Sequence, residues 1–257
     1  RRSSDLERRF ELVRVFNCLK NTEVDRQIGD RRGRNAVEAR VSGPSRNLPT
    51  GPDLLDFSIS PDKEFISVVC TDRRDFYHQF ATSTNRTLSN TVGPVLALND
   101  LVGTSAFEQF QNRSKLRRQK RTVEGDKLGF TARQQFAKVG PGHCMIAFGS
   151  IFQGDHAGVE IATSAHEGIL QDAGLLDDDS RLLASRPFWG DNLCQGLVID
   201  DYFAIAKIPK GLLVDDPAME CLRRSKARYL SLNVLGSDDK DIKGVPEAKV
   251  IGAYVNG

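Results

Sequence analysis

The 257-residue sequence predicts a mixed α+β fold, because its strand and helix signals alternate only loosely along the chain. Its content of 39% hydrophobic and 27% charged residues is typical of a folded globular protein rather than a disordered one. No apolar run approaches the ~20 residues that span a bilayer, so we expect no membrane partner. The length allows one large domain or two small ones with a substantial core.

One helix, one loop and one strand are expected early in the chain. Apolar residues near helical spacing predict an amphipathic helix over Asp5–Leu19. Glycines and prolines over Ser42–Pro52 predict a loop or linker. The mainly apolar run Phe65–Cys70 predicts a buried strand, and a helix is expected to start at Phe76.

Two further helices and a hairpin are expected later in the chain. A helix over about Asp155–Ala173 ends where Gly174 suits the C′ position. The segment Gly196–Ala206 has the pattern of a strand, a tight acidic turn and a second strand. Asp216 as N-cap, followed by a proline at the first helical position, predicts the start of another helix.

The net charge of +2 is a balance between basic and acidic regions. Residues 1–40 hold eleven basic and seven acidic residues, a net of +4. Asp172–Asp201 holds seven acids and two arginines, a net of −5. Arg113–Arg121 holds six basic residues and no acid, and either a solvated loop or a phosphate-binding segment would explain it.

The five cysteines are far apart, and none forms a C-x-x-C pair. This pattern argues against a zinc site and against a disulfide framework. We therefore expect free thiols and an intracellular location, in the cytoplasm or the nucleus.

Acidic residues end two of the apolar segments. Asp200 and Asp201 lie between apolar residues, where charge is unfavourable unless the turn is exposed or binds cations. Asp72 ends the strand predicted from Phe65, where a helix N-cap is the alternative. If the two strands are neighbours, the three carboxylates converge and raise one another's pKa unless a divalent metal neutralises them. Mg²⁺ favours such carboxylates together with phosphate oxygens, and a pair of ions suits phosphoryl transfer.

Four blocks follow one another along the chain: Arg26–Asn35, Asp72–Phe80, Phe152–Asp155 and Val198–Asp201. A weaker fifth block pairs Lys240 with Gly252. In order and spacing they resemble the reverse transcriptase domain of retrotransposons, of the gypsy-like, LTR-related kind. The resemblance spans about residues 20–255.

This resemblance implies an α+β right-hand polymerase fold that consists of fingers and palm. The palm is expected to be an antiparallel sheet backed by helices. The implied fingers are discontinuous, over residues 1–62 and 81–150, and the implied palm covers residues 63–80 and 151–257. We expect neither a thumb nor an RNase H domain in the chain.

The resemblance also implies the site residues. Asp72, Asp200 and Asp201 are the expected catalytic residues and ligands of two Mg²⁺ ions, with Mn²⁺ as an alternative metal. The expected substrate-binding residues are Arg26, Arg32, Tyr77, Gln153, Gly154 and Lys240. The arginines would hold the triphosphate, and the tyrosine would exclude a 2′-hydroxyl. Gln153 and Gly154 would lie where template and nucleotide meet. The lysine would act on the leaving pyrophosphate. The alternatives are an Arg32–Asp30 ion pair, a core position for the tyrosine, an ordinary strand-to-helix turn at the glycine and a solvated lysine.

The implied function is RNA-directed DNA synthesis from dNTPs on an RNA or DNA template with a primer. A viral RNA-dependent RNA polymerase is one alternative, although that class tends to have an acid in place of Tyr77 and a glycine in place of Ile199. An inactive retroelement remnant that binds nucleic acid is the other alternative. The sequence does not specify an oligomeric state.

Overall fold

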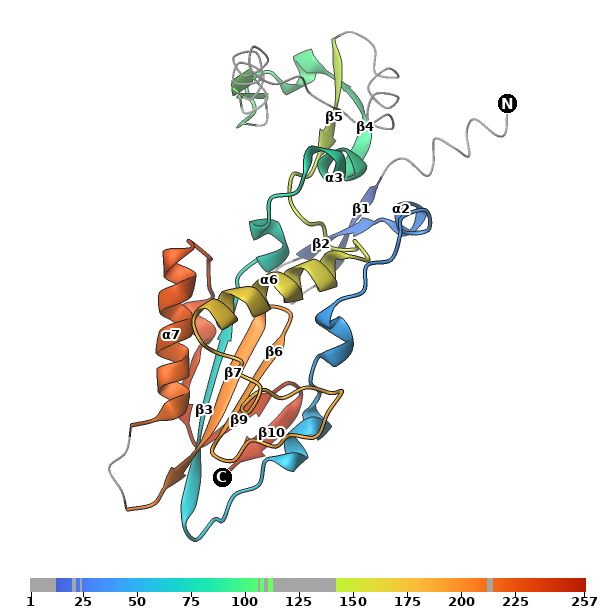
Figure 1. Ribbon diagram of the computed structural model, residues 1–257. Helices are drawn as coiled ribbons and strands as arrows, with labels where there is room; N and C mark the ends of the chain where they lie inside the picture. Colours follow the sequence, from blue (N-terminus) through green and yellow to red (C-terminus); the bar gives the residue numbers. More distant parts are fainter. Residues whose placement is uncertain are drawn as a thin grey trace. The chain divides into compact units, whose positions relative to one another are not determined.

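The computed structural model describes residues 13–19, 22–23, 25–105, 107–108, 111–112, 142–211 and 215–257. The chain is a mixed α+β protein with antiparallel sheets and helices (Figure 1). It divides into two compact units, each built from two separate stretches of sequence: Arg1–Ala39 with Ala81–Asp155, and Arg40–Phe80 with His156–Gly257. None of the helices in the described ranges has both the length and the apolar character of a membrane span.

The first unit contains two antiparallel strand pairs. Its elements are β1 (Arg14–Leu19), β2 (Asp25–Asp30), α2 (Arg32–Asn35), α3 (Thr84–Ser89), β4 (Thr91–Ala97), η4 (Leu98–Leu101) and β5 (His143–Ala147). Strand β1 pairs with β2, and β4 pairs with β5. A small core forms from Val13, Val92 and Phe152, with Phe148 packed against it.

The helix predicted over Asp5–Leu19 is wrong in the part that the structure describes. Arg14–Leu19 forms strand β1, whose register with β2 runs from Arg14 opposite Asp30 to Leu19 opposite Asp25. The earlier residues of the predicted helix lie outside the described ranges. Val13 also joins Val92 through a parallel bridge, so long-range strand pairing overrides the local apolar spacing.

The second unit is built around a four-stranded antiparallel sheet in the order β6-β7-β3-β8. Its strands are β3 (Glu64–Asp72), β6 (Leu193–Val198), β7 (Asp201–Pro209) and β8 (Ile242–Val245), followed by a hairpin of β9 (Glu247–Val250) and β10 (Ala253–Asn256). Its helices are η1 (Pro44–Asn47), η2 (Gly51–Asp56), η3 (Phe76–Gln79), α6 (Gly158–Asp172), α7 (Pro217–Ser231) and η5 (Asp238–Lys240).

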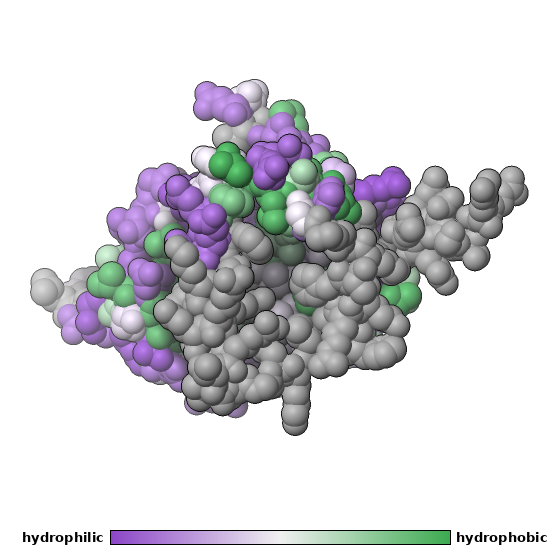
Figure 2. Space-filling view, turned by 90° about the horizontal axis from the view of Figure 1, so that it is seen from above, coloured by the Kyte–Doolittle hydropathy of each residue, from purple (hydrophilic) through white to green (hydrophobic). Residues whose placement is uncertain are grey.

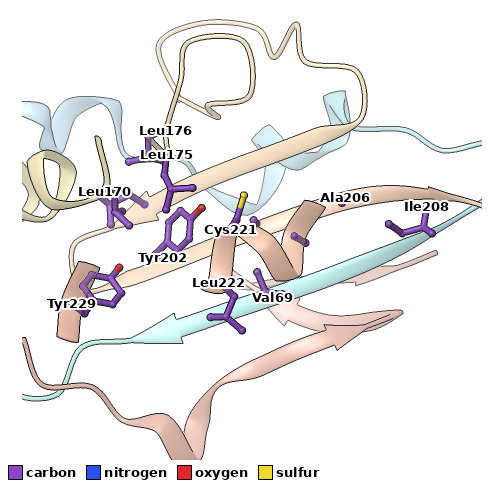
Figure 3. Packing of buried hydrophobic residues seen from close by; sticks show 13 residues of the cluster. Val69, Leu170, Leu175, Leu176, Tyr202, Ala206, Ile208, Cys221, Leu222 and Tyr229 are labelled. Atoms are coloured by element: carbon purple, nitrogen blue, oxygen red, sulfur yellow. The ribbon is translucent and has the colours of Figure 1, made fainter. Parts of the chain in front are cut away.

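Helices α6 and α7 lie on one face of this sheet (Figures 1 and 3). Alternate residues of β7 point into the core on this face, among them Tyr202 and Ala204, and pack against Cys221 and Leu222 of α7 and Leu170 of α6. The intervening β7 residues point to the opposite core, which is completed by η2 and the β9–β10 hairpin. Because both faces are covered, β7 is apolar along most of its length.

Several sequence predictions for this unit are confirmed. The predicted strand Phe65–Cys70 lies inside β3, and the predicted hairpin is β6–β7. Asp216 caps α7 by accepting hydrogen bonds from two backbone N–H groups. Gly174 follows α6 with a φ of +67°.

The helix expected from Phe76 is only the four-residue 3-10 helix η3. The helix ends at Phe80, whose backbone is extended, and the Gln79 side chain bonds to both the N–H and the carbonyl of Leu235. Asp72 is the last residue of β3, so the helix N-cap alternative for Asp72 does not apply. The predicted loop Ser42–Pro52 contains η1 and the start of η2.

All five cysteines are free, as expected. The basic run Arg113–Arg121 lies outside the described residues. On the described surface in Figure 2, hydrophobic residues are interspersed with hydrophilic ones.

Candidate active site

The end of the central strand pair carries two of the three predicted catalytic residues. Strand register places Asp72, at the end of β3, directly opposite Asp201, at the start of β7. Directly opposed residues of antiparallel strands have Cα atoms ~4.5–5.5 Å apart, and their side chains project from the same face. Neighbouring strands therefore bring these two carboxylates together.

Asp200 lies in the turn that joins β6 to β7. Val198 pairs with Asp201, so Ile199 and Asp200 are the two residues of a tight loop. Ile199 has a φ of +59°, a conformation that β-branched residues rarely adopt and that glycine favours in hairpin turns. The Asp200 carbonyl accepts a hydrogen bond from the backbone N–H of Arg73 at 3.1 Å, which ties the turn to the residue after Asp72.

The electrostatics of the turn favour binding of a cation. Burial raises the pKa of Asp201 to about 6, with further contributions from the Asp200 and Asp72 carboxylates and an opposing effect of Lys240. Divalent cations relieve this kind of repulsion. Within the described residues, no three Asp, Glu, His or Cys side chains form a ready-made metal cluster. The donor set nevertheless fits Mg²⁺, which needs few protein carboxylates when phosphate oxygens complete its shell.

Lys240 and Tyr77 lie beside these acids. The Lys240 ammonium is 3.5 Å from an Asp72 carboxylate oxygen, and its side chain is more than half exposed. Tyr77 is partly buried, and its pKa is raised by burial and by the Asp200 carboxylate. The neighbouring Phe76 occupies the core position, packed against Phe80. The tyrosine ring therefore remains at the edge of the acidic site.

The first unit contains the other predicted residues. Arg26 is exposed on β2. Arg32 is also exposed and forms an ion pair with Asp30 at 2.7 Å, the alternative that the sequence left open. The Arg32 hydrogen bond is the main cause that lowers the pKa of Asp30 to about 2.

Two sequence-distant blocks meet in the first unit. The Gly29 N–H donates to the Gln153 carbonyl at 3.0 Å, and the Asn35 side chain donates to the Gly154 carbonyl at 2.8 Å. Gly154 has a φ of +104°, and a Cβ there would lie only 2.0 Å from the Gly29 carbonyl oxygen. The predicted turn at Gln153–Gly154 thus requires glycine for both conformation and space.

Sequence reasoning missed a buried charge network beside this turn. The Arg31 guanidinium is fully buried and bonds to Asp155 and Glu38, each at 2.8 Å, and to Asn90. Arg86 binds the same two carboxylates. The only local signal is that Arg31 lies between the predicted Asp30 and Arg32, which does not reveal its burial.

No protein-family model and no curated protein matches this sequence. Among solved structures, the foamy viral protease–reverse transcriptase in complex with double-stranded DNA aligns with a TM-score of 0.55 and 9% identity, covering 95% of this chain and 29% of that one. Native Prototype Foamy Virus protease–reverse transcriptase aligns with a TM-score of 0.46 and 10% identity, covering 96% of this chain and 23% of that one. The chain thus spans less than a third of the proteins that it resembles. The first likeness shows that the fold resembles part of a reverse transcriptase structure.

Proposed function

We propose that this chain is a reverse transcriptase domain that extends a primer from dNTPs on an RNA or DNA template. The observation that carries the proposal is the pairing of Asp72 with Asp201 beside the Asp200 turn. The mutual effect of these carboxylates on the pKa of Asp201 supports it. The fold-level likeness to a reverse transcriptase gives independent support.

In the proposed reaction, the primer 3′-hydroxyl attacks the α-phosphorus of the dNTP. An oxygen–phosphorus ester bond forms, the bond from the α-phosphorus to its leaving oxygen breaks, the hydroxyl proton is released and pyrophosphate departs. Asp72, Asp200 and Asp201 would hold two Mg²⁺ ions, which when bound would neutralise charge on the attacking and leaving oxygens.

The remaining residues are proposed to bind and orient the substrates. Tyr77 would place its ring against the sugar and exclude a 2′-hydroxyl. Lys240, already paired with Asp72, would offer a positive charge to the departing pyrophosphate. Arg26 and Arg32 would bind phosphates. To do so, the Arg32 guanidinium would have to leave the Asp30 carboxylate and bind a phosphate in its place.

Primer extension by the full chain tests the proposal. Wild type should incorporate dNTPs in the order that the template dictates, and Asp72→Asn and Asp200→Asn should lose at least 100-fold in rate, the order of a removed transition-state contact. Asp191→Asn is the matched control, since it makes the same charge change at an exposed carboxylate. Its rate should equal that of wild type.

The two alternatives give different results in the same assay. Preferential incorporation of ribonucleotides over deoxynucleotides would favour an RNA polymerase. Binding of template–primer without incorporation in Mg²⁺ or Mn²⁺ would refute the proposed catalysis and identify a nucleic-acid-binding remnant.

A further inference from the structure

A histidine that the proposed reaction does not use lies beneath the acidic turn. His166 of α6 is completely buried, as is Tyr229 of α7. Each imidazole nitrogen has one partner: Nδ1 lies 2.8 Å from the Ile199 carbonyl oxygen, and Nε2 lies 2.6 Å from the Tyr229 hydroxyl. The ring also packs against Phe76, with centroids 4.9 Å apart.

The partners determine where the protons lie. A carbonyl oxygen can only accept, so Nδ1 carries the proton and donates to Ile199. Burial lowers the pKa of His166 to about 4, so the imidazole is neutral at physiological pH. Nε2 is then an acceptor, and the Tyr229 hydroxyl donates to it. The hydrogen bonds run in one direction, from the Tyr229 hydroxyl through the imidazole to the turn.

The histidine completes the support of the turn. Ile199 and Asp200 are its two central residues, and both carbonyls are bound from within the unit: the first by His166 and the second by the backbone N–H of Arg73. The Arg73 guanidinium is buried and lies 4.0 Å from the centroid of the Tyr229 ring. Tyr229 therefore contacts both supporting residues, His166 through its hydroxyl and Arg73 through its ring.

The Ile199 conformation explains why the turn needs this support. A β-branched residue with a φ of +59° is strained and persists only where its surroundings impose that conformation. Without the bond from Nδ1, the Ile199 carbonyl loses its partner and the turn is less firmly held in this strained conformation. Because Asp200 directly follows Ile199, a change in the turn backbone would displace Asp200 relative to Asp72.

We infer that His166 is a positioning residue, whose Nδ1–H holds the strained Ile199 turn so that Asp200 and Asp201 face Asp72. This inference rests on the proposed polymerase function for its kinetic consequence. The hydrogen-bonded arrangement itself does not depend on that function.

Two substitutions separate the two bonds of the imidazole. The Asn side-chain amide can occupy the place of Nδ1, and the Gln amide can occupy the place of Nε2. His166→Asn therefore keeps a donor for Ile199, whereas His166→Gln keeps a partner for Tyr229 and loses the donor to the turn. Both variants remove the same ring from the core, so each is the stability control of the other.

The kinetic test compares single-nucleotide incorporation at saturating template–primer. We expect His166→Gln to lower kcat by about 10- to 100-fold, the range for lost support of a ligand, with the dNTP KM nearly unchanged. His166→Asn should recover kcat to within about threefold of wild type, and both variants should unfold at similar temperatures. Equal kcat values for the two variants would overturn the inference, because a merely structural histidine would not distinguish them.

Binding of Mn²⁺ alone, followed by electron paramagnetic resonance, tests the inference without catalysis. His166→Gln should weaken Mn²⁺ binding by about tenfold relative to His166→Asn, because its carboxylates are less well placed. Nitrogen-15 NMR of histidine-labelled chain should show His166 as the neutral Nδ1–H tautomer. If wild type incorporates no nucleotide, the proposed function fails, and the Mn²⁺ and NMR results still decide the inference. Equal Mn²⁺ affinity or an Nε2–H tautomer would overturn it.

Discussion

Replacing Asp201 with asparagine is expected to stabilise the metal-free chain at neutral pH. The folded chain raises the pKa of this carboxyl from 3.8 to about 6, first through burial and then through the Asp200 and Asp72 carboxylates. Between these two values the folded state binds more protons than the unfolded state. The protonated carboxyl therefore favours the folded state. This stabilising contribution is fully present below pH ~4 and is lost as the pH rises through about 6, where the carboxyl becomes charged.

The magnitude follows from the same values. A rise from 3.8 to about 6 gives an upper limit of ~3 kcal/mol at ~1.36 kcal/mol per pKa unit. Asp201 is only partly buried, with more than a third of its surface exposed at the end of the strand, and the resulting screening reduces the expected effect to ~1 kcal/mol. Asparagine does not ionise, so Asp201→Asn should not lose this folding stability as the pH rises.

Urea unfolding in EDTA at pH 4 and at pH 7.5 measures the effect. Raising the pH from 4 to 7.5 should increase the unfolding free energy of Asp201→Asn, relative to that of wild type, by ~1 kcal/mol. Asp191→Asn, an exposed control with the same charge change, should show no comparable pH dependence. A difference for Asp201→Asn that is constant with pH would refute the reasoning, because it would mean that folding does not raise the pKa of Asp201.

Three further outcomes are expected. Mg²⁺ should raise the unfolding temperature of wild type but not of Asp72→Asn, as scanning fluorimetry with increasing Mg²⁺ would show; equal shifts would place the metal elsewhere. Tyr77→Ala should accept ribonucleotides at least tenfold more readily relative to dNTPs, whereas Tyr77→Phe should keep the wild-type preference; unchanged selectivity in Tyr77→Ala would remove the ring from sugar discrimination. Arg31→Leu should destabilise the chain by at least ~1.5–3 kcal/mol in urea unfolding, because it removes a buried guanidinium bonded to Asp155, Glu38 and Asn90, whereas Arg32→Leu should change stability by less than ~1 kcal/mol; similar losses would contradict the difference in burial.

The elements that were predictable from sequence have local signals of their own. The apolar run of β3 and the capped start of α7 need no distant partner to be recognised. The acids are recognisable because charge beside apolar strands is unfavourable. The sequence then predicts that the two strands are neighbours, and the pairing of Asp72 with Asp201 agrees with this.

The remaining features depend on contacts between residues far apart in the sequence. Strand β1 forms because β2 and β4 lie beside it, which an apolar pattern alone does not indicate. His166 resembles any other position on the inner side of α6, and its role is visible only once Ile199 lies next to it. The Arg31 network escapes notice for the same reason, since Arg31 and Asp155 are 124 positions apart.

That separation has a consequence for how the chain acquires its structure. During synthesis at ~5–20 residues per second, Arg31 waits ~6–25 s before Asp155 is made. Its partners Glu38 and Asn90 are made earlier, but until Asp155 is made the buried charge network is incomplete and the first unit cannot close around it. The second unit combines Arg40–Phe80 with His156–Gly257, so it too stays open until its second stretch has been made. Interleaved units of this kind are expected to fold late and slowly, and neither can be released as a contiguous fragment by cutting the chain once.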